Sequence, residues 1–293
     1  MMRIDSREKY INPLTDFGFK KLFGSEPNKI LLIDFLNQVL PNKKIQDLSY
    51  SSTEKLGKTE IDRKAVFDLY CIGDQGERFI VEMQKAKQNY FKDRSVFYAS
   101  FPIQEQAQKS EWNYQLEAIY SVGILDFIFD DQASDANLLH VVELKDQRCE
   151  VFYDKLKFVY IELPKFRKKE NELSSHFDKW LYVFTHLSQL QDRPKALQER
   201  IFKRLFDAAE IARFSPEERD AYEESLKYYR DIKNIVDTSK AEGKEEGREE
   251  GREKGRKERS YEIAQQMKQK GYPIEQISEL TGLSPSEIER LTR

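Results

Sequence analysis

Two strongly apolar segments joined by a turn constrain the fold of this chain more than any other feature. Residues 64–72, KAVFDLYCI, and 78–85, RFIVEMQK, have strand-like composition, and GDQG at 73–76 has the chemistry of a hairpin turn. We therefore expect an antiparallel hairpin within a buried sheet. At 293 residues, the chain is long enough to build one large domain or two smaller ones around it.

Polar residues interrupt the second segment within FIVEMQ. Successive side chains of a strand point to opposite faces, so Glu82 and Gln84 share one face while Phe79, Val81 and Met83 take the other. A carboxylate in such apolar surroundings costs free energy unless something pairs with it. The chemistry of this hairpin therefore depends on the partner of Glu82.

An antiparallel hairpin would bring Asp68, on the first strand, beside Glu82 on the second. Two buried like charges are unstable together unless a cation joins them. Oxygen ligands select hard ions, so we expect Mg²⁺, with Mn²⁺ as a substitute, held by these two carboxylates and the backbone carbonyl of Met83. The amide of Gln84 would hold the attacking water or a phosphate.

The alternative is a structural role for the carboxylate. In that interpretation Glu82 forms an ion pair with Lys64 or Lys85 and binds no metal. We favour the metal interpretation.

Composition limits the class of protein. The net charge of −3 does not indicate a nucleic-acid binder by itself, although an average hides local basic patches. Cys71 and Cys149 are the only cysteines, too few for a disulfide framework or a zinc ligand set. No secretory signal is visible, and the apolar run at 120–129 is too short for a bilayer and contains Asp126. We expect a cytoplasmic protein without a membrane segment.

The rest of the chain alternates between helical and strand-like patterns. A helix is expected over 27–40, ended by Pro41, and another over 90–109 with a bend at Pro102. Further strands are expected near 115–129, 137–145 and 150–163, and further helices over 177–187, 196–212 and 218–236. This order predicts a layered α/β or α+β domain.

Residues 240–259 form a four-residue repeat, KAEG-KEEG-REEG-REKG-RKER. Each glycine costs roughly 1 kcal/mol against alanine in a helix, so the segment should be marginal by itself. We favour a solvated, partly helical linker. The alternative is that the glycine stripe lets a second copy pack closely, which would give a homodimer through the C-terminal tail.

The C-terminal piece, 261–293, predicts three short helices in a helix-turn-helix-like arrangement. Gly271 and Gly282 end the first two, and Ser284-Pro285-Ser286-Glu287 forms a capping box. Five acidic and four basic residues make a poor surface for phosphates. We expect an interaction or dimer-stabilising module rather than a reader of DNA bases.

The ordered set of motifs resembles one known family. Asp68, thirteen residues and then Glu82-Met83-Gln84 are similar to the PD-(D/E)XK nuclease pattern, with Gln84 in place of the usual Lys. The surroundings resemble the Rpn family of recombination-promoting nucleases, or putative transposases, over essentially the whole chain. The matching blocks are NPLTDFGFKKLFG at 12–24, LLIDFLNQVLP at 31–41, FDL at 67–69, IVEMQ at 80–84, RSVFYAS at 94–100, IELPKF at 161–166, the EG[KR]EEG tail and the TGLS…EI ending.

The resemblance implies a Mg²⁺-dependent DNA endonuclease that hydrolyses phosphodiester bonds. Asp68 and Glu82 would ligate the metal, and the neutral Gln84 would leave a missing charge that Lys64 or Arg94 supplies. Two alternatives stand beside it. One is a catalytically weak or inactive nuclease fold that acts as a DNA-binding or assembly module, and the other is an RNA nuclease.

The resemblance also implies a fold: a PD-(D/E)XK core, in which helices flank a central mixed sheet. We expect that core over 1–170, a helical extension packed on it over 171–236, a charged glycine-repeat linker or helix over 237–259 and the helix-turn-helix-like module over 260–293.

Residues around the proposed metal site provide further candidates. Arg94 and Tyr98, one helical turn apart, would contact DNA phosphates or form a stacked structural pair, and Lys85 and Lys20 would bind the DNA backbone. Asp16 is either an outer carboxylate near the metal or the N-cap of the first helix, and we prefer the cap.

Overall fold

The computed structural model describes residues 8–40, 43–55, 65–107, 113–129 and 136–291. The chain divides into two compact units, residues 1–233 and 234–293. The first unit carries the sheet and the candidate site.

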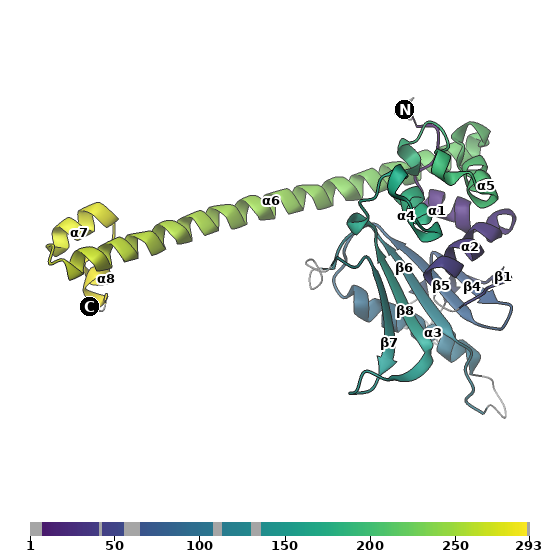
Figure 1. Cartoon of the computed structure of the whole chain (residues 1–293), viewed down its shortest axis with the longest axis horizontal. Helices are drawn as coiled ribbons and strands as arrows, with labels where there is room; N and C mark the ends of the chain where they lie inside the picture. Colours follow the sequence, from purple (N-terminus) through teal and green to yellow (C-terminus); the bar gives the residue numbers. More distant parts are fainter. Residues whose placement is uncertain (1–7, 41–42, 56–64, 108–112, 130–135, 292–293) are drawn as a thin grey trace. The chain divides into compact units, whose positions relative to one another are not determined.

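A mixed six-stranded sheet forms the centre of the first unit, with the strand order β1-β4-β5-β6-β8-β7 (Figure 1). Strands β4 and β5 are antiparallel, β5, β6 and β8 run parallel, and β7 returns antiparallel to β8. Helix α3 makes the connection from β5 to the parallel β6. The strands are β1 (Leu48–Tyr50), β4 (Leu69–Gly73), β5 (Arg78–Gln84), β6 (Ile119–Leu125), β7 (Leu139–Lys145) and β8 (Val151–Glu162), beside a separate pair, β2 (Glu54–Lys55) and β3 (Ala65–Val66).

The predicted hairpin is present, with Leu69 opposite Val81 in the register of β4 and β5. Its turn places Gly76 at φ 86°, a conformation that favours glycine. The expected strand over 64–72 is broken, however, because the backbone N–H of Phe67 bonds to Thr53 beside the β2–β3 pair before β4 begins. Asp68 therefore lies immediately before β4 and not within a strand, which corrects the expectation.

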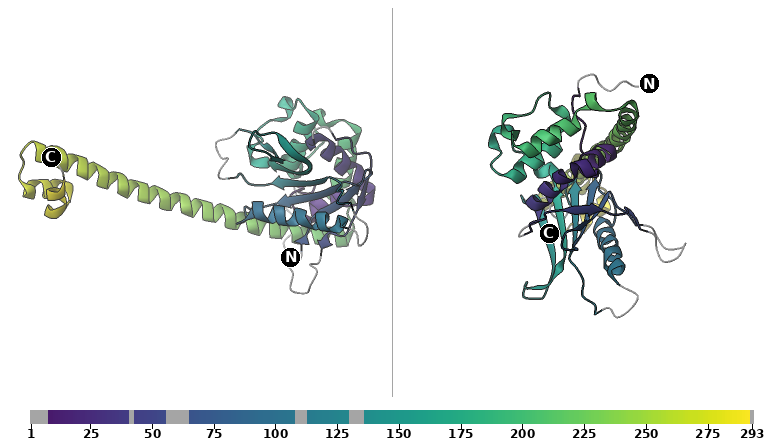
Figure 2. Two further views of the ribbon diagram at one scale, coloured as in Figure 1. Left: turned by 90° about the horizontal axis from the view of Figure 1, so that it is seen from below. Right: turned by 90° about the vertical axis from the view of Figure 1, so that its right-hand side faces the viewer.

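The two faces of the sheet are covered differently (Figure 2). One face, including Val81 and Met83, packs in the main apolar core with helices from both ends of the first unit. The opposite face carries Tyr70 and Ile80, which cluster with Phe67 under α3. The helices of the first face are α1 (Asp16–Phe23), α2 (Lys29–Val39), α4 (His176–His186) and α5 (Arg200–Ala209), and α3 spans Phe91–Gln106.

Most predicted helices are confirmed, with shifted ends. Helices α2 and α3 lie where the periodicity placed them, but the helix expected over 196–212 is shortened to α5, with 3₁₀ turns on either side. These and other 3₁₀ turns are Glu26–Asn28, Leu163–Lys165, Glu170–Glu172, Leu187–Gln189, Lys195–Leu197 and Ile211–Arg213.

The glycine repeat is a continuous helix and not the partly helical linker that we favoured, although it is solvated as expected. Helix α6 runs from Pro216 to Gln269 without a break and includes all four repeat glycines. The residues between the glycines are strong helix formers, and Arg248 pairs with Glu245 at 3.5 Å along the helix. Repeat residues 240–259 are exposed to solvent throughout.

The C-terminal unit contains the end of α6, α7 (Ile274–Thr281) and α8 (Pro285–Arg290) around a small core. Gly271 and Gly282 take positive φ angles of 81° and 72°, as expected for glycines that end helices. The predicted capping box is present, with the Ser284 hydroxyl and the Glu287 backbone N–H in contact. The first of the three expected short helices is the end of α6.

Candidate active site at the end of β5

Two carboxylates meet where β5 ends and β4 begins. The Asp68 carboxylate accepts a 2.7 Å hydrogen bond from the Met83 backbone N–H, and the Glu82 carboxylate accepts a 3.4 Å bond from the Asp68 backbone N–H. Each side chain thus reaches toward the backbone of the other strand. The hairpin register holds the pair together, as its sequence predicted.

Burial and mutual repulsion disfavour two negative charges at this point. Burial and, after it, the nearby charge of Asp68 raise the pKa of Glu82 to about 8. Burial also raises the pKa of Asp68, against the opposing hydrogen bond from Met83. The folded chain therefore favours a proton or a bound cation at this pair of carboxyl groups.

Gln84 lies on the same face as Glu82 and contacts it directly. Its amide nitrogen donates a 3.1 Å hydrogen bond to the second carboxylate oxygen of Glu82. That bond leaves the amide oxygen as an acceptor, which suits the orientation of a water molecule. Gln84 is therefore a neutral side chain that orients Glu82.

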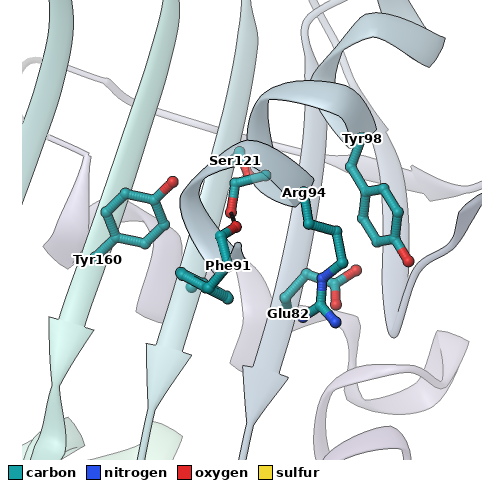
Figure 3. A pocket seen from close by; sticks show the side chains of 8 residues that line it. Glu82, Phe91, Arg94, Tyr98, Ser121 and Tyr160 are labelled. Atoms are coloured by element: carbon teal, nitrogen blue, oxygen red, sulfur yellow. Dashed lines mark hydrogen bonds between the residues drawn. The ribbon is translucent and has the colours of Figure 1, made fainter. Parts of the chain in front are cut away.

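Arg94 is a cation on this face. It projects from α3 toward Glu82, and its charge partly offsets the rise in the Glu82 pKa (Figure 3). Its guanidinium also lies 5.7 Å from the ring centroid of Tyr98 and bonds to Gln88. The stacked Arg94–Tyr98 pair is present, and Tyr98 in turn packs edge-on against Phe67.

A small hollow separates Glu82 from α3. It is lined on the strand side by Ser121 and Gly123, and Gly123 lies opposite Glu82 in the parallel register of β5 and β6. A Cβ atom at Gly123 would lie 2.9 Å from the ring of Tyr160, so a larger residue does not fit without a shift. The sequence gives no local signal for either lining residue.

The cation Lys85 lies on the opposite face of the sheet end. It follows Gln84 and lines a second hollow together with Asp16 and Lys20 of α1. Burial lowers the pKa of Lys85, while the charges of Asp16 and Asp68 oppose that change. Lys85 does not pair with Glu82, in contrast to the structural alternative considered from the sequence.

The N-cap of α1 is Thr15 and not Asp16. The Thr15 hydroxyl accepts a hydrogen bond from the Gly18 backbone N–H, whereas Asp16 lies in the first turn and forms a 3.0 Å ion pair with Lys20. The preference for Asp16 as the cap was therefore wrong. Its negative charge raises the pKa of Asp68, which places it near the candidate site.

Two site neighbours were missed by sequence reasoning. The backbone N–H of Asp126 donates to the Gln84 carbonyl at 2.9 Å, and its carboxylate accepts a 2.9 Å bond from the buried Tyr229 of α6. The sequence could have indicated Asp126, because this charged residue interrupts the apolar run at 120–129. Tyr229 lies 103 residues farther along the chain, and no pattern in the sequence connects it with this site.

The donor set fits a divalent cation. The two carboxylates, short of positive charge, match the small number of protein ligands that Mg²⁺ takes when water and phosphate fill its other positions. Within the described ranges, no group of three or more His, Cys, Asp or Glu side chains could hold a metal. Lys64 lies outside the described residues.

Comparison with known families gives two matches. A family model described as "PD-(D/E)XK nuclease family transposase" matches residues 13–239, and a second, "Rpn/YhgA-like nuclease family, C-terminal HTH domain", matches residues 257–293. No curated protein and no solved structure matches the chain. The match to a helix-turn-helix domain favours DNA binding for the C-terminal unit, against the expectation of an interaction module.

The fold and the matches assign the chain to a family. The mixed sheet flanked by helices is consistent with a PD-(D/E)XK core, and the match covers well over half of the sequence. In the described part of the chain, no helix has both the length and the apolar character needed to cross a membrane. The chain belongs to the Rpn/YhgA-like branch of the PD-(D/E)XK nuclease family transposases.

Proposed function

We propose that the protein is a metal-dependent DNA endonuclease that hydrolyses phosphodiester bonds with Mg²⁺, or with Mn²⁺ in its place. Asp68 and Glu82 would hold the ion, and the Met83 backbone carbonyl would be a further ligand. The observation that carries the proposal is the convergence of two mutually repelling carboxylates at the end of β5. When bound, the ion supplies positive charge to the phosphate and lowers the pKa of water.

The protein side chains would position the reactants. Gln84 is held by its bond to Glu82, and its free amide oxygen orients the attacking water. Arg94, with Tyr98 beneath it, offers its guanidinium to a phosphate at the mouth of the hollow. Lys64 is the second candidate for the charge that Gln84 lacks, and Lys85 and Lys20 are candidates for contacts to the DNA backbone.

A plasmid-nicking assay tests the proposal. Wild-type protein should nick supercoiled DNA with Mg²⁺ and not with EDTA, and Glu82→Ala should lower the rate at least about 100-fold. Glu150→Ala removes an exposed carboxylate from the β7–β8 turn and serves as the matched control. If Glu82→Ala nicks as fast as wild type, the catalytic assignment is wrong.

A second candidate function is DNA binding or assembly without cleavage. The helix-turn-helix match favours it, because that unit can bind DNA whether or not the first unit cleaves. The neutral Gln84 at the lysine position points the same way. Tight DNA binding without metal-dependent nicking, by a protein whose fold is intact, would support this function over the first.

A further inference from the structure

Two hollows border the segment that follows Gln84, and each contains an exposed tyrosine. The first, of about 610 Å³, lies between α1 and the first turns of α6 and includes Lys85 and Tyr228. The second, of about 330 Å³, lies at the start of α3 and includes Tyr90 and Lys92. We call them the α6 hollow and the α3 hollow. Both fall within the size range of small-ligand sites.

The hollows open on opposite faces of the same sheet end. Ile124 and Leu125, adjacent in β6, point into two different apolar clusters. The α6 hollow borders the cluster of Ile124, whose members include α1 and the first part of α6, whereas Phe91 and Phe129 of the α3 hollow belong to the cluster of Leu125. The segment 85–90, which directly follows β5 and its Glu82, contributes Lys85 to the α6 hollow and Lys87 and Tyr90 to the α3 hollow.

Both tyrosines are more exposed to solvent than is usual for such large aromatic side chains. Tyr90 is 80% exposed and Tyr228 is 60% exposed. Tyr90 also has a backbone φ of 60°, in the left-handed region that an aromatic residue rarely adopts. Strained, exposed residues beside a candidate site are typical of residues that contact a ligand.

Positive charge accompanies both rings. The Lys85 ammonium lies 5.0 Å from the ring centroid of Tyr228. In all, five lysines and three carboxylates line the two hollows: Lys20, Lys21, Lys85, Lys87 and Lys92 against Asp16, Glu224 and Asp93. A site that binds single-stranded nucleic acid usually combines lysines along the phosphate backbone with aromatic rings on which the bases stack.

Building on the nuclease proposal, we propose that the two hollows form one track for a single DNA strand. Tyr228 and Tyr90 stack against the bases on either side of the scissile phosphate, and the lysines bind the neighbouring phosphates. A base in a duplex is stacked and paired with its neighbours and does not offer its face to these rings. The preferred substrate is therefore single-stranded or locally unpaired DNA.

Binding, measured without cleavage, tests the track. The full chain is titrated in EDTA against a fluorescein-labelled single-stranded oligonucleotide, with excess unlabelled duplex present to occupy the helix-turn-helix unit. Tyr228→Ala and Tyr90→Gly should each weaken binding on the order of tenfold, the usual effect of removing one stacking ring. Glycine is used at Tyr90 because it keeps the positive φ while it removes the ring.

Matched variants separate stacking from damage to the fold. Tyr228→Trp should bind within about twofold of wild type, because tryptophan preserves the stacking face. Phe152→Ala removes an aromatic ring that is 82% exposed on β8 and should leave binding unchanged. Thermal unfolding of each variant checks that the fold is kept.

The track is overturned if both ring deletions bind the single strand within twofold of wild type, or if Tyr228→Trp loses as much affinity as Tyr228→Ala. These outcomes differ from failure of the nuclease proposal, which is read from plasmid nicking by Glu82→Ala. Wild-type nicking together with unchanged single-strand binding by the ring deletions would refute the track alone.

Discussion

The two units of this chain bury apolar surface on very different scales. The first unit packs its sheet and helices around large rings such as Phe23 and Trp180, both almost fully buried. Among the described residues, the buried core of the C-terminal unit consists of Ala264, Ile277, Leu283 and Ile288. A large core buries enough apolar surface to offset the unfavourable free energy of two repelling carboxylates. The stability of a small core depends on each apolar contact and each helix cap.

Paired truncations of the two cores should show the largest effects. Phe23→Ala removes a ring that contacts four other aromatic side chains, those of Phe19, Phe35, Trp180 and Phe184, and should cost about 3–5 kcal/mol. Ile277→Ala should cost about 2–5 kcal/mol, which is enough to unfold the small C-terminal unit. Hydrogen exchange read by mass spectrometry measures both effects.

The segments that lose protection from hydrogen exchange show whether the two cores are independent. Phe23→Ala should raise exchange in β5 and β6, and Ile277→Ala should raise it in α7 and α8 while the sheet stays protected. Equal loss of protection in β5 from both variants would contradict the independence of the two cores. The exposed Ile263→Ala provides a control within the C-terminal unit.

Glu82→Gln measures how much the buried carboxylate of Glu82 destabilises the first unit. The pKa of Glu82 is about 8 in the folded chain and 4.5 as its ordinary value, so the folded state favours the protonated acid. The stability that this proton contributes is fully present below pH 4.5 and is lost as the pH rises through 8. The variant should therefore match wild type near pH 3.5, below the ordinary pKa, and exceed it by more than about 1 kcal/mol at pH 8.5, without metal.

Denaturant unfolding at the two pH values checks this prediction. Mg²⁺ should stabilise wild type at pH 8.5 and have less effect on Glu82→Gln, because the neutral amide is a poor ligand. The exposed Glu150→Gln should follow wild type at both pH values. A Gln variant less stable than wild type at pH 8.5 would show that the carboxylate is already paired.

The smallest effects belong to the repeat of α6. A Cβ atom at Gly243, Gly247, Gly251 or Gly255 would meet open space, so alanine at these positions should stabilise the helix by about 0.5–1 kcal/mol each. Circular dichroism and hydrogen exchange in 240–259 measure the gain. Sedimentation of the same variant tests the homodimer: a stripe that packs against a second copy would lose association when alanine is introduced, and a solvated helix would not.

Local patterns in the sequence were sufficient for several elements. The period-two alternation of FIVEMQ placed Glu82 and Gln84 on one face, and the GDQG turn paired the two strands. The capping box at Ser284 predicted the start of α8. These predictions succeed because each depends on the chemistry of a few neighbouring residues.

Other features of the candidate site depended on packing between distant segments. Asp68 lies before β4 because the chain changes its pairing partner there, and no local signal marks that change. The single helix α6 merged three predicted segments, since its continuity depends on the sum of propensities along its length.

The sequence by itself determined the hairpin, the pair of carboxylates and the family, because strand alternation and turn chemistry act between near neighbours. Only the tertiary structure decided that Arg94 approaches Glu82 from α3, that Lys85 faces the other side, and that α6 brings Tyr228 and Tyr229 to the end of β5. Those arrangements depend on how helices pack against a sheet, and that packing is set by contacts between residues far apart in the chain.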